Sequence, residues 1–221
     1  MLIDELKNIA RNNGIVGAGG AGFPAYAKMT EKADTVILNC VECEPLLKLH
    51  RQLLATHTEE IIQMLDEVRE SFGAKEAVIG IKSEYVTTIK AIEEVIGDFP
   101  NVRICALKAA YPMGDEVVLI YEATGRVIKP GGLPIDENVV VYNVETMYNL
   151  YRAVHLNIPV TNKLVSIVGE IDHPLTVRVP LGTTVKEAIS LAGKITVEDP
   201  AYVMGGPMMG RLGTENTVIT K

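Results

Sequence analysis

Tryptophan is absent from this 221-residue sequence, and aromatic residues together make up only 5% of it. Platforms that bind single-stranded nucleic acid stack bases on exposed aromatic rings, so this composition argues against such a protein. The three cysteines are an odd number and do not make a disulfide framework, which fits a reducing compartment. The composition therefore excludes a base-stacking protein and a disulfide-stapled secreted domain.

A long apolar run is also missing, because no stretch approaches the roughly 20 apolar residues that a membrane-spanning helix needs. The first residues carry Asp4 and Glu5 where a secretory signal would be apolar. A formal net charge of −7 disfavours a broad basic surface that grips nucleic acid or anionic lipid. We therefore expect a cytoplasmic protein without a transmembrane segment and without a nucleic-acid partner.

The residues that are present predict a folded α/β protein, with 48% hydrophobic and 22% charged residues. Apolar spacing indicates helices that alternate with short buried strands, which is the pattern of a parallel sheet covered by helices. The expected strands are 35–39, 77–81, 102–107 and 139–142, and the expected helices are 2–13, 46–72, 85–96, 114–124 and 144–155. These elements predict a Rossmann-like domain over residues 1–160.

The pattern changes after residue 160 and predicts a small second domain over residues 161–221. A strand at 164–170, a turn, a strand at 175–179 and a helix at 185–191 form the start of a β-grasp fold. Thr183 or Thr184 is expected to cap that helix. The glycine-rich segment 205–210 is expected to be irregular and hinge-like.

A glycine loop follows the first predicted helix and satisfies G-x-G-x-x-G at Gly17, Gly19 and Gly22, with Gly20 between them. Such a loop lets main-chain N–H groups approach a phosphate closely. The dinucleotide-binding version has a strand before the glycines and a helix after them, whereas here a helix precedes the loop and Pro24 follows it. The alternative is a plain turn without a ligand, although five glycines in nine residues cost more backbone entropy than a plain turn requires.

Polar residues follow the first predicted strand, at the strand end where open α/β sheets place ligand groups. Asn39 can donate to and accept from the edge of a heterocycle, and Glu42 follows it in the next loop. The alternative is a solvated acidic turn. Cys40 and Cys43 form a C-x-x-C pair that lacks the further ligands of a zinc or cluster site, so no metal is expected, and a redox disulfide is the remaining alternative.

Two more polar runs precede predicted helices. The run 111–116 ends in Asp115 and Glu116, whose alternative role is to offset the helix dipole. Asn143 is expected to cap the helix at 144–155, whose free N–H groups suit a phosphate. Lys28 lies just beyond the glycine loop, where a phosphate favours a cation, although a solvated lysine is the alternative. The histidines are assigned no chemistry.

The order of these motifs resembles the RnfC family over nearly the whole chain. The matching runs are Gly14-Ile-Val-Gly-Ala-Gly-Gly-Ala-Gly-Phe-Pro, Asn39 with Glu42-Cys-Glu-Pro, Tyr111-Pro-Met-Gly-Asp-Glu, Asn143-Val-Glu-Thr and Gly205-Gly-Pro-Met-Met-Gly. That family shares its flavin fold with the NADH-binding flavoprotein subunit of respiratory complex I. Within it, the runs are most similar to those of cobalamin reductases, with proline reductase-associated electron-transfer proteins as close rivals.

The resemblance implies binding of FMN and NADH, followed by an SLBB module of β-grasp fold from about residue 164. It places Glu42 and Glu116 where they position nicotinamide and tune the flavin potential. The other implied cofactor-binding residues are Gly17, Gly19, Gly20, Gly22 and Lys28 at the phosphates, Phe23 beside the dinucleotide, Asn39, Tyr111 and Gly114 around the rings, and Asn143 and Thr146 at the FMN phosphate.

The implied activity is hydride uptake from NADH by FMN and electron transfer to an iron–sulfur or corrinoid-binding partner protein. The location expected from the family is the cytoplasm, a bacterial microcompartment or the periphery of a membrane, and a homo-oligomer is compatible with the sequence. Two departures stand out. Ala18 replaces an arginine that complex I carries between the first two glycines of the tight loop. The ferredoxin-like cysteine run of the family is missing, so 4Fe–4S clusters are expected only in a further C-terminal region or a partner protein.

Three alternatives to a flavin-dependent electron-transfer enzyme stay open. One is the RnfC subunit of a membrane-associated ferredoxin:NAD oxidoreductase. Another is a conventional NAD-dependent dehydrogenase, which would purify without flavin colour. The last is a non-enzymatic docking module in which the β-grasp part binds a partner.

Overall fold

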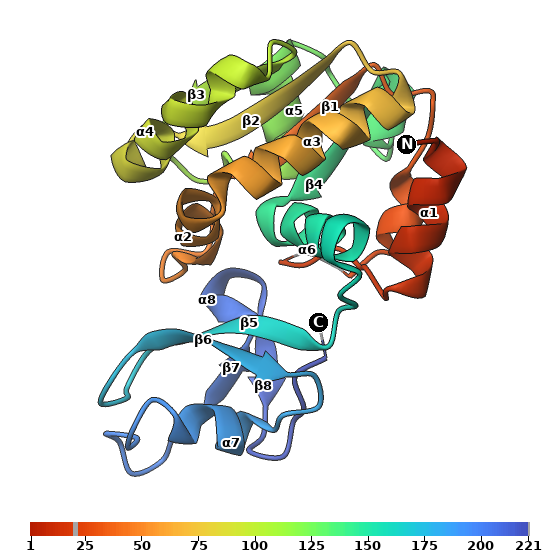
Figure 1. The fold of residues 1–221 in the computed structure, drawn as a ribbon. Helices are drawn as coiled ribbons and strands as arrows, with labels where there is room; N and C mark the ends of the chain where they lie inside the picture. The colour runs from red at the N-terminus through yellow and green to blue at the C-terminus, as the bar shows by residue number, and fades with distance from the viewer. Residues whose placement is uncertain (20–21, 221) are drawn as a thin grey trace. The chain divides into compact units, whose positions relative to one another are not determined.

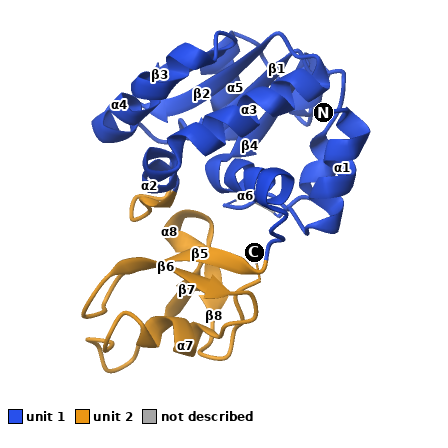
Figure 2. Ribbon diagram, in the orientation of Figure 1, with its two compact units in different colours: residues 1–43, 50–160 blue, residues 44–49, 161–221 orange. Residues whose placement is uncertain are grey.

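The computed structural model describes residues 1–19 and 22–220. Its contacts divide the chain into two compact units, residues 1–43 with 50–160 and residues 44–49 with 161–221 (Figure 2). The first unit holds the long helices and the larger sheet. The short segment 44–49 groups with the second unit, which the sequence patterns do not indicate.

The first unit is built on a four-stranded parallel sheet in the order β3-β2-β1-β4 (Figure 1). The strands are β1 (Thr35–Cys40), β2 (Glu76–Lys82), β3 (Val102–Leu107) and β4 (Val139–Asn143). All three strand pairs are parallel, so the predicted α/β class with a parallel sheet is confirmed. The strand order reverses between β1 and β4, because the chain moves outward through β2 and β3 and then returns to the other side of β1.

Helices cover both faces of this sheet. On one face α3 and α6 contact β1, while α1 and α4 pack beside them; α5 lies on the other face (Figure 1). The helices are α1 (Ile3–Asn12), α3 (Thr58–Phe72), α4 (Val86–Val95), α5 (Glu116–Thr124) and α6 (Val144–Leu156), with short 3₁₀ turns η1 (Ala25–Lys28), η2 (Ile96–Asp98) and η3 (Pro134–Glu137). This double cover explains why β1, β2 and β4 are nearly continuous buried runs rather than alternating ones.

Alternate residues of the strands form the core beneath α5. Ile37, Val78 and Val139 are fully buried there together with Leu119 of α5. Gly80 follows Val78 on the same side of β2, and a Cβ added to it would lie 2.5 Å from Leu119 Cδ1. This glycine therefore lets α5 pack close to the sheet.

The predicted long helix over residues 46–72 is wrong in one respect, because the structure has two helices, α2 (Leu49–Thr56) and α3. The chain leaves helical geometry at His57, which has φ −124° and ψ 44°. The hydroxyl of Thr58 donates to Leu54 O at 2.7 Å and braces this bend. As predicted, α3 ends at Gly73, whose φ of 68° suits glycine.

The start of α5 also differs slightly from the prediction. The helix begins at Glu116 rather than at residue 114, and the side chain of Asp115 accepts hydrogen bonds from the main-chain N–H groups of Val117 and Val118. Asp115 is therefore an N-cap, and the interpretation that it serves the helix end is supported.

The second unit contains two small antiparallel sheets and two short helices. They are β5 (Asn162–Ile167) with β6 (Leu175–Pro180), β7 (Tyr202–Met204) with β8 (Arg211–Gly213), α7 (Val185–Ser190) and α8 (Gly206–Met209). Thr184 caps α7 as predicted, and the Glu187 carboxylate accepts a hydrogen bond from the Thr184 N–H at 2.8 Å. The expectation of an irregular segment at 205–210 is wrong, because α8 occupies most of it between two strands.

Glu44 explains why the segment 44–49 belongs to the second unit. Its carboxylate accepts hydrogen bonds from the main-chain N–H groups of Met208 and Met209 at 3.1 Å. A Cβ on Gly206 would lie 2.5 Å from Glu44 Cδ, and Gly206 has a φ of 83°. Both contact and backbone conformation therefore require glycine at this position of the Gly-Gly-Pro-Met-Met-Gly run.

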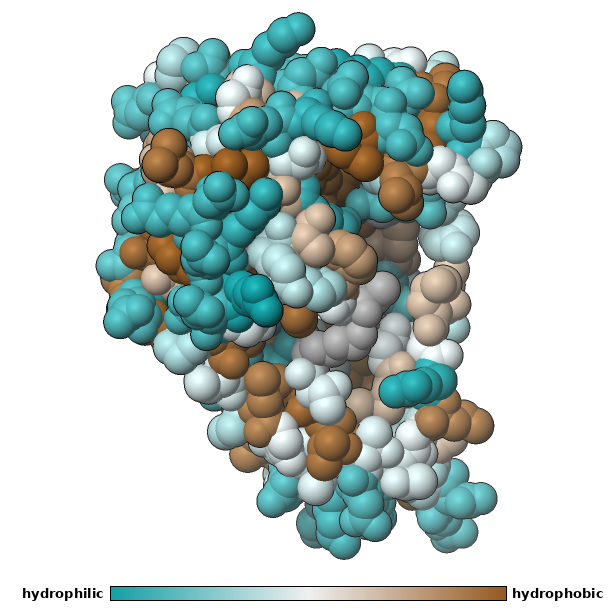
Figure 3. All heavy atoms as spheres, turned by 90° about the vertical axis from the view of Figure 1, so that its right-hand side faces the viewer, coloured by the Kyte–Doolittle hydropathy of each residue, from teal (hydrophilic) through white to brown (hydrophobic). Residues whose placement is uncertain are grey.

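Exposed apolar side chains do not by themselves mark a functional surface. On the face drawn in Figure 3 they stand in small groups among polar ones, as on most protein surfaces. Across the described part of the chain, every helix is too short or too polar to traverse a bilayer.

Candidate functional site

The predicted site residues gather at the carboxyl edge of the parallel sheet. Asn39 is the second-last residue of β1, and Asn143 is the last residue of β4. The two residues are register partners on adjacent strands. The strand order reverses between these two strands. In open α/β sheets a reversal of this kind opens a crevice at the carboxyl ends, where ligands bind.

The glycine loop closes on itself next to this edge. Val16 and Pro24 form an antiparallel bridge, and Gly17 N donates to Phe23 O at 2.8 Å. Gly19 and Gly22 have φ angles of 81° and 74°, which glycine adopts readily. Gly20, also predicted to contact phosphate, lies outside the described residues.

Two hydrogen bonds attach the loop to the start of α6. Ala18 N donates to Thr146 Oγ1 at 2.9 Å, and Asn143 Nδ2 donates to Ala18 O at 3.0 Å. Asn143 occupies the N-cap position as predicted, but its side chain makes no capping bond because the amide binds the loop instead. The glycine loop and the α6 N-terminus therefore form one structure.

His50, to which the sequence patterns assign no chemistry, reaches the same place from α2. A Cβ added to Gly19 would lie 2.8 Å from His50 Cε1 and 3.5 Å from Asn143 Nδ2. The imidazole thus packs on the Cα of Gly19. The positive φ of residue 19 favours glycine, and a larger residue there would displace the His50 ring.

Glu42 is a buried carboxylate between β1 and α2. Its Oε1 accepts from His50 N at 2.8 Å, and its main-chain carbonyl accepts from Lys82 Nζ at 2.7 Å. Its Oε2 lies 3.4 Å from Arg51 Nε but has no hydrogen-bond partner among the described residues. Burial raises the pKa of Glu42, against the opposing effects of the His50 N–H and the charge of Arg51.

The raised pKa of Glu42 gives a testable pH dependence. A carboxyl with a higher pKa in the folded than in the unfolded chain stabilises the fold below its ordinary value of 4.5, and this contribution is lost as pH rises through the folded-state pKa. Glu42→Gln removes the dependence, so the free energy of unfolding of the variant should rise relative to wild type between pH 4 and pH 7. Urea unfolding at pH 4 and at pH 7 measures the free energy of unfolding of both proteins. Glu93→Gln, at an exposed position, is the control. A free-energy difference between Glu42→Gln and wild type that is the same at both pH values would contradict the prediction.

Asn39 and Gly114 hold the loop after β3 against the loop after β1. Asn39 Nδ2 donates to Gly114 O at 3.0 Å, and Gly114 N donates to Cys43 Sγ at 3.2 Å. A Cβ on Gly114 would lie 1.9 Å from Val41 O, so only glycine fits. Burial raises the pKa of Cys40 well above its ordinary value, which disfavours the thiolate form.

Lys28 and Glu116, both predicted site residues, form a pair. Lys28 Nζ lies 3.1 Å from Glu116 Oε1 and donates to Val141 O at 3.3 Å. The charge of Lys28 is therefore engaged with Glu116. Both side chains are about a third or more exposed, so this pair adds little to stability.

The two predicted aromatic residues are surface residues. Phe23 is 51% exposed and Tyr111 is 64% exposed, so their rings present apolar area to solvent at the two loops that border the sheet edge. Among the described residues, no group of three or more His, Cys, Asp or Glu side chains is placed to hold a metal ion.

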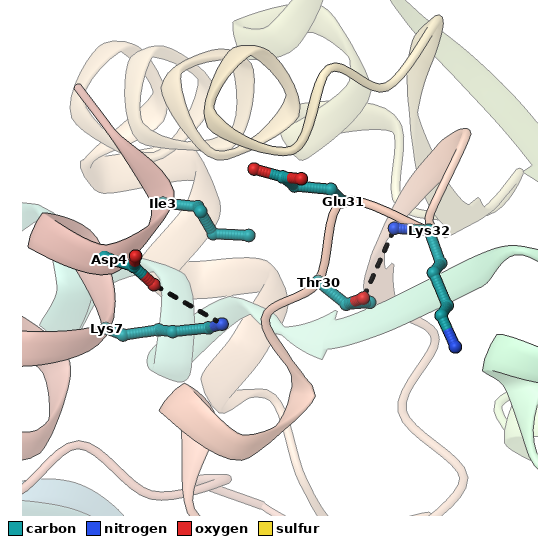
Figure 4. Close-up of a pocket in the computed structure, with 6 residues that line it drawn as sticks. All are labelled: Ile3, Asp4, Lys7, Thr30, Glu31 and Lys32. Carbon is teal, nitrogen blue, oxygen red and sulfur yellow. Dashed lines mark hydrogen bonds and ion pairs between the residues drawn. The ribbon is translucent and has the colours of Figure 1, made fainter.

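A separate hollow of about 370 Å³ lies between the start of α1 and residues 30–32 (Figure 4). None of its lining residues was predicted for the site. Its walls carry mixed charges that pair locally, as Lys7 does with Asp4 at 3.8 Å. The sheet edge, where the predicted residues Asn39 and Asn143 lie side by side, is therefore the better candidate.

Comparison with known proteins identifies the family. The model described as the Nuo51 FMN-binding domain matches residues 10–152, which include the glycine loop and both strand ends described above. The chain belongs to this family. A second model, the SLBB domain, matches residues 164–212 of the second unit.

Relatives of the Nuo51-type chain include a cobalamin reductase and a component of a ferredoxin:NAD⁺ oxidoreductase complex. It is 40% identical over 217 residues to cobalamin reductase PduS of Citrobacter freundii, covering 98% of this chain and 48% of that protein. It is 32% identical over 212 residues to one component of the Na⁺-translocating ferredoxin:NAD⁺ oxidoreductase complex of Acetobacterium woodii, covering 94% and 48%. The predicted RnfC-family resemblance is confirmed, and the chain spans about half the length of these relatives.

The fold also matches solved structures. A chain of the NAD⁺-reducing [NiFe]-hydrogenase in the air-oxidized state aligns with a TM-score of 0.75 at 22% identity. The alignment covers 91% of this chain and 40% of that one. At this identity the likeness shows the fold of the Nuo51-type chain.

His50 and Arg51 are the members of the site that sequence reasoning missed. Both stand at the start of α2, and both contact the Glu42 side chain, one through its main-chain N–H and one through its guanidinium. The only sequence signal was their place shortly after Glu42, at the beginning of an amphipathic helix. That signal does not distinguish them from surface residues.

Proposed function

We propose that this chain binds FMN at the carboxyl edge of β1 and β4 and works with NADH in electron transfer. The observation that carries the proposal is the attachment of the glycine loop to the first turn of α6, through Ala18, Thr146 and Asn143, at the point where the strand order reverses. Main-chain N–H groups of a glycine loop and of a helix N-terminus together suit a phosphate. Membership of the FMN-binding-domain family supports the same site.

The residues present fit a flavin nucleotide at two places. At the phosphate end, Gly19 has no side chain between His50 and Asn143, so the main chain itself forms the surface of the loop there. At the ring end, Glu42 keeps one buried oxygen, Oε2, that lies 3.4 Å from Arg51 Nε but accepts no hydrogen bond among the described residues. A buried acceptor of this kind costs free energy unless a ligand group or water completes it.

The predicted residues outside the glycine loop take the following parts in the proposal. Asn39 and Gly114 hold the two loops that border the ring, through their mutual hydrogen bond. Glu42 presents its carboxylate to the nicotinamide, and Phe23 and Tyr111 cover the rings from the surface. Lys28 holds Glu116 at the start of α5, so that the second carboxylate is oriented toward the same edge.

Bound FMN supplies the chemistry, since it accepts a hydride from NADH and releases electrons singly to an iron–sulfur or corrinoid-binding partner. The protein residues bind and orient the two nucleotides and set the local charge. In this proposal the 4Fe–4S centres belong to the additional length seen in relatives such as PduS, or to a partner protein. The final acceptor is then a corrinoid or a ferredoxin, the molecules named in the two relatives' activities.

Anaerobic reduction tests the proposal. The chain is loaded with FMN, freed of excess flavin and titrated with NADH, while the visible absorption of the flavin is recorded. We expect the flavin band to bleach with one NADH per FMN. If the chain retains FMN but NADH does not bleach it, FMN binding is supported and the proposed reaction with NADH is contradicted. A folded chain that takes up no FMN would overturn the whole proposal and favour a docking module, whereas NADH binding without flavin would favour a conventional dehydrogenase.

A further inference from the structure

Three elements meet at Gly19, and His50 supplies the basic side chain among them. A Cβ added to Gly19 would lie 2.9 Å from His50 Nε2 and 3.5 Å from Asn143 Nδ2. The loop thus passes between the start of α2 and the start of α6. The ring of His50 touches the part of the loop that the proposed function assigns to phosphate.

The position of His50 is fixed by its neighbours on α2. Its main-chain N–H donates to Glu42 Oε1 at 2.8 Å, which anchors the first turn of the helix to the loop after β1. The next residue, Arg51, directs its guanidinium to Glu42 Oε2 and over the ring of Tyr85, 4.4 Å from the ring centroid. The first turn of α2 is therefore held from two sides, and it carries the His50 imidazole to the loop.

The cationic side chains near the glycine loop, Lys28 and Arg51, are paired with carboxylates, and the His50 imidazole is a further side chain that can donate a hydrogen bond there. Lys28, the cation predicted for the phosphates, is engaged with Glu116 and Val141 O. Position 18 is a buried alanine and carries no charge. Arg51 faces Glu42. His50 brings a ring donor to the glycine loop from outside it.

We propose that His50 is a further nucleotide ligand, whose ring N–H donates a hydrogen bond to the phosphate group held at the glycine loop. This inference rests on the proposed function, because it needs a nucleotide at that loop. The chemistry recognised is that of a phosphate ester, which the FMN phosphate and the NADH pyrophosphate share. A hydrogen bond to a charged oxygen is worth more than one between neutral groups, so its loss should be measurable.

Binding of phosphorylated and unphosphorylated flavin tests the inference. Dissociation constants for FMN and riboflavin are measured by flavin fluorescence for wild type, His50→Ala and His50→Gln. The FMN-loaded proteins are then titrated with NAD⁺, which carries the same pyrophosphate as NADH but does not reduce the flavin. His173→Ala, at an exposed turn of the second unit, is the matched control. We expect His50→Ala to weaken FMN binding about tenfold and riboflavin binding by less than about twofold, with His50→Gln in between because its amide still donates.

The outcomes separate the sources and the failures. Weaker FMN binding with unchanged riboflavin binding assigns His50 to the FMN phosphate, and weaker NAD⁺ binding alone assigns it to the pyrophosphate; both support the inference. Equal losses for FMN and riboflavin would show a merely structural role and overturn it. Unchanged binding in His50→Ala, with wild type binding both nucleotides, overturns the inference and leaves the proposed function intact. If the wild-type protein binds neither nucleotide, the proposed function itself is contradicted.

Discussion

Replacing Gly114 by alanine should destabilise the first unit by about 3 kcal/mol and abolish FMN binding. A Cβ at this position would lie 1.9 Å from the main-chain oxygen of Val41 and 2.8 Å from Cys43 Sγ. Because the first of these atoms belongs to the backbone, the clash cannot be relieved by a side-chain rotation. The loop after β3 must move, and its bond to Asn39 breaks with it.

Chemical denaturation and flavin fluorescence measure the two effects of Gly114→Ala. Gly97→Ala is the matched control, since a Cβ on Gly97 meets no described atom within 4 Å. We expect the control to change the free energy of unfolding by less than about 0.5 kcal/mol and to bind FMN normally. A Gly114→Ala protein as stable as wild type would show that the two loops are not packed as described.

Replacing Gly19 by alanine should weaken FMN binding about 100-fold while costing only about 1 kcal/mol of stability. Its φ of 81° strains any residue with a Cβ, but the nearest atoms are those of the His50 ring, which can rotate away. The fold therefore tolerates the change. The loop surface does not, because the new methyl group occupies the space at which His50 and Asn143 converge.

Gly14→Ala provides the control for backbone strain at the same loop. Gly14 has a φ of 67°, yet a Cβ on it would meet nothing within 4 Å. Strain alone should therefore lower stability in both variants by a similar amount, whereas only Gly19→Ala should lose FMN. Isothermal titration of both proteins with FMN decides this. Equal affinities in the two variants would remove Gly19 from the nucleotide site.

The first unit was largely predictable because a parallel sheet buries both faces of its strands. Continuous apolar runs gave β1 and β4 to within a residue at each end. The break between α2 and α3 was not predictable, since no glycine or proline marks it and the apolar spacing runs through His57. In the second unit, α8 was missed because the Glu44 carboxylate that binds its N–H groups is more than 160 positions away in the sequence.

The candidate site was predictable where chemistry follows from strand ends and glycine content. Asn39, Glu42 and the glycine loop were found in this way. The hydrogen bond from the Asn143 side chain to Ala18 O could not be predicted. Local propensity favours Asn143 as a side-chain cap of α6, and only the tertiary fold brings the Ala18 carbonyl within its reach. The contact between His50 and Gly19 was hidden for the same reason, and so was the engagement of Lys28 with Glu116.

The central claim is that the glycine loop and the start of α6 together hold the phosphate of a flavin nucleotide. Its most direct test is a calorimetric titration of the wild-type chain with FMN and, separately, with riboflavin at the same concentrations. We expect one FMN bound per chain and riboflavin binding weaker by at least about tenfold, because only FMN carries the phosphate. Equal affinity for the two flavins, or no binding of either by a folded chain, would contradict it.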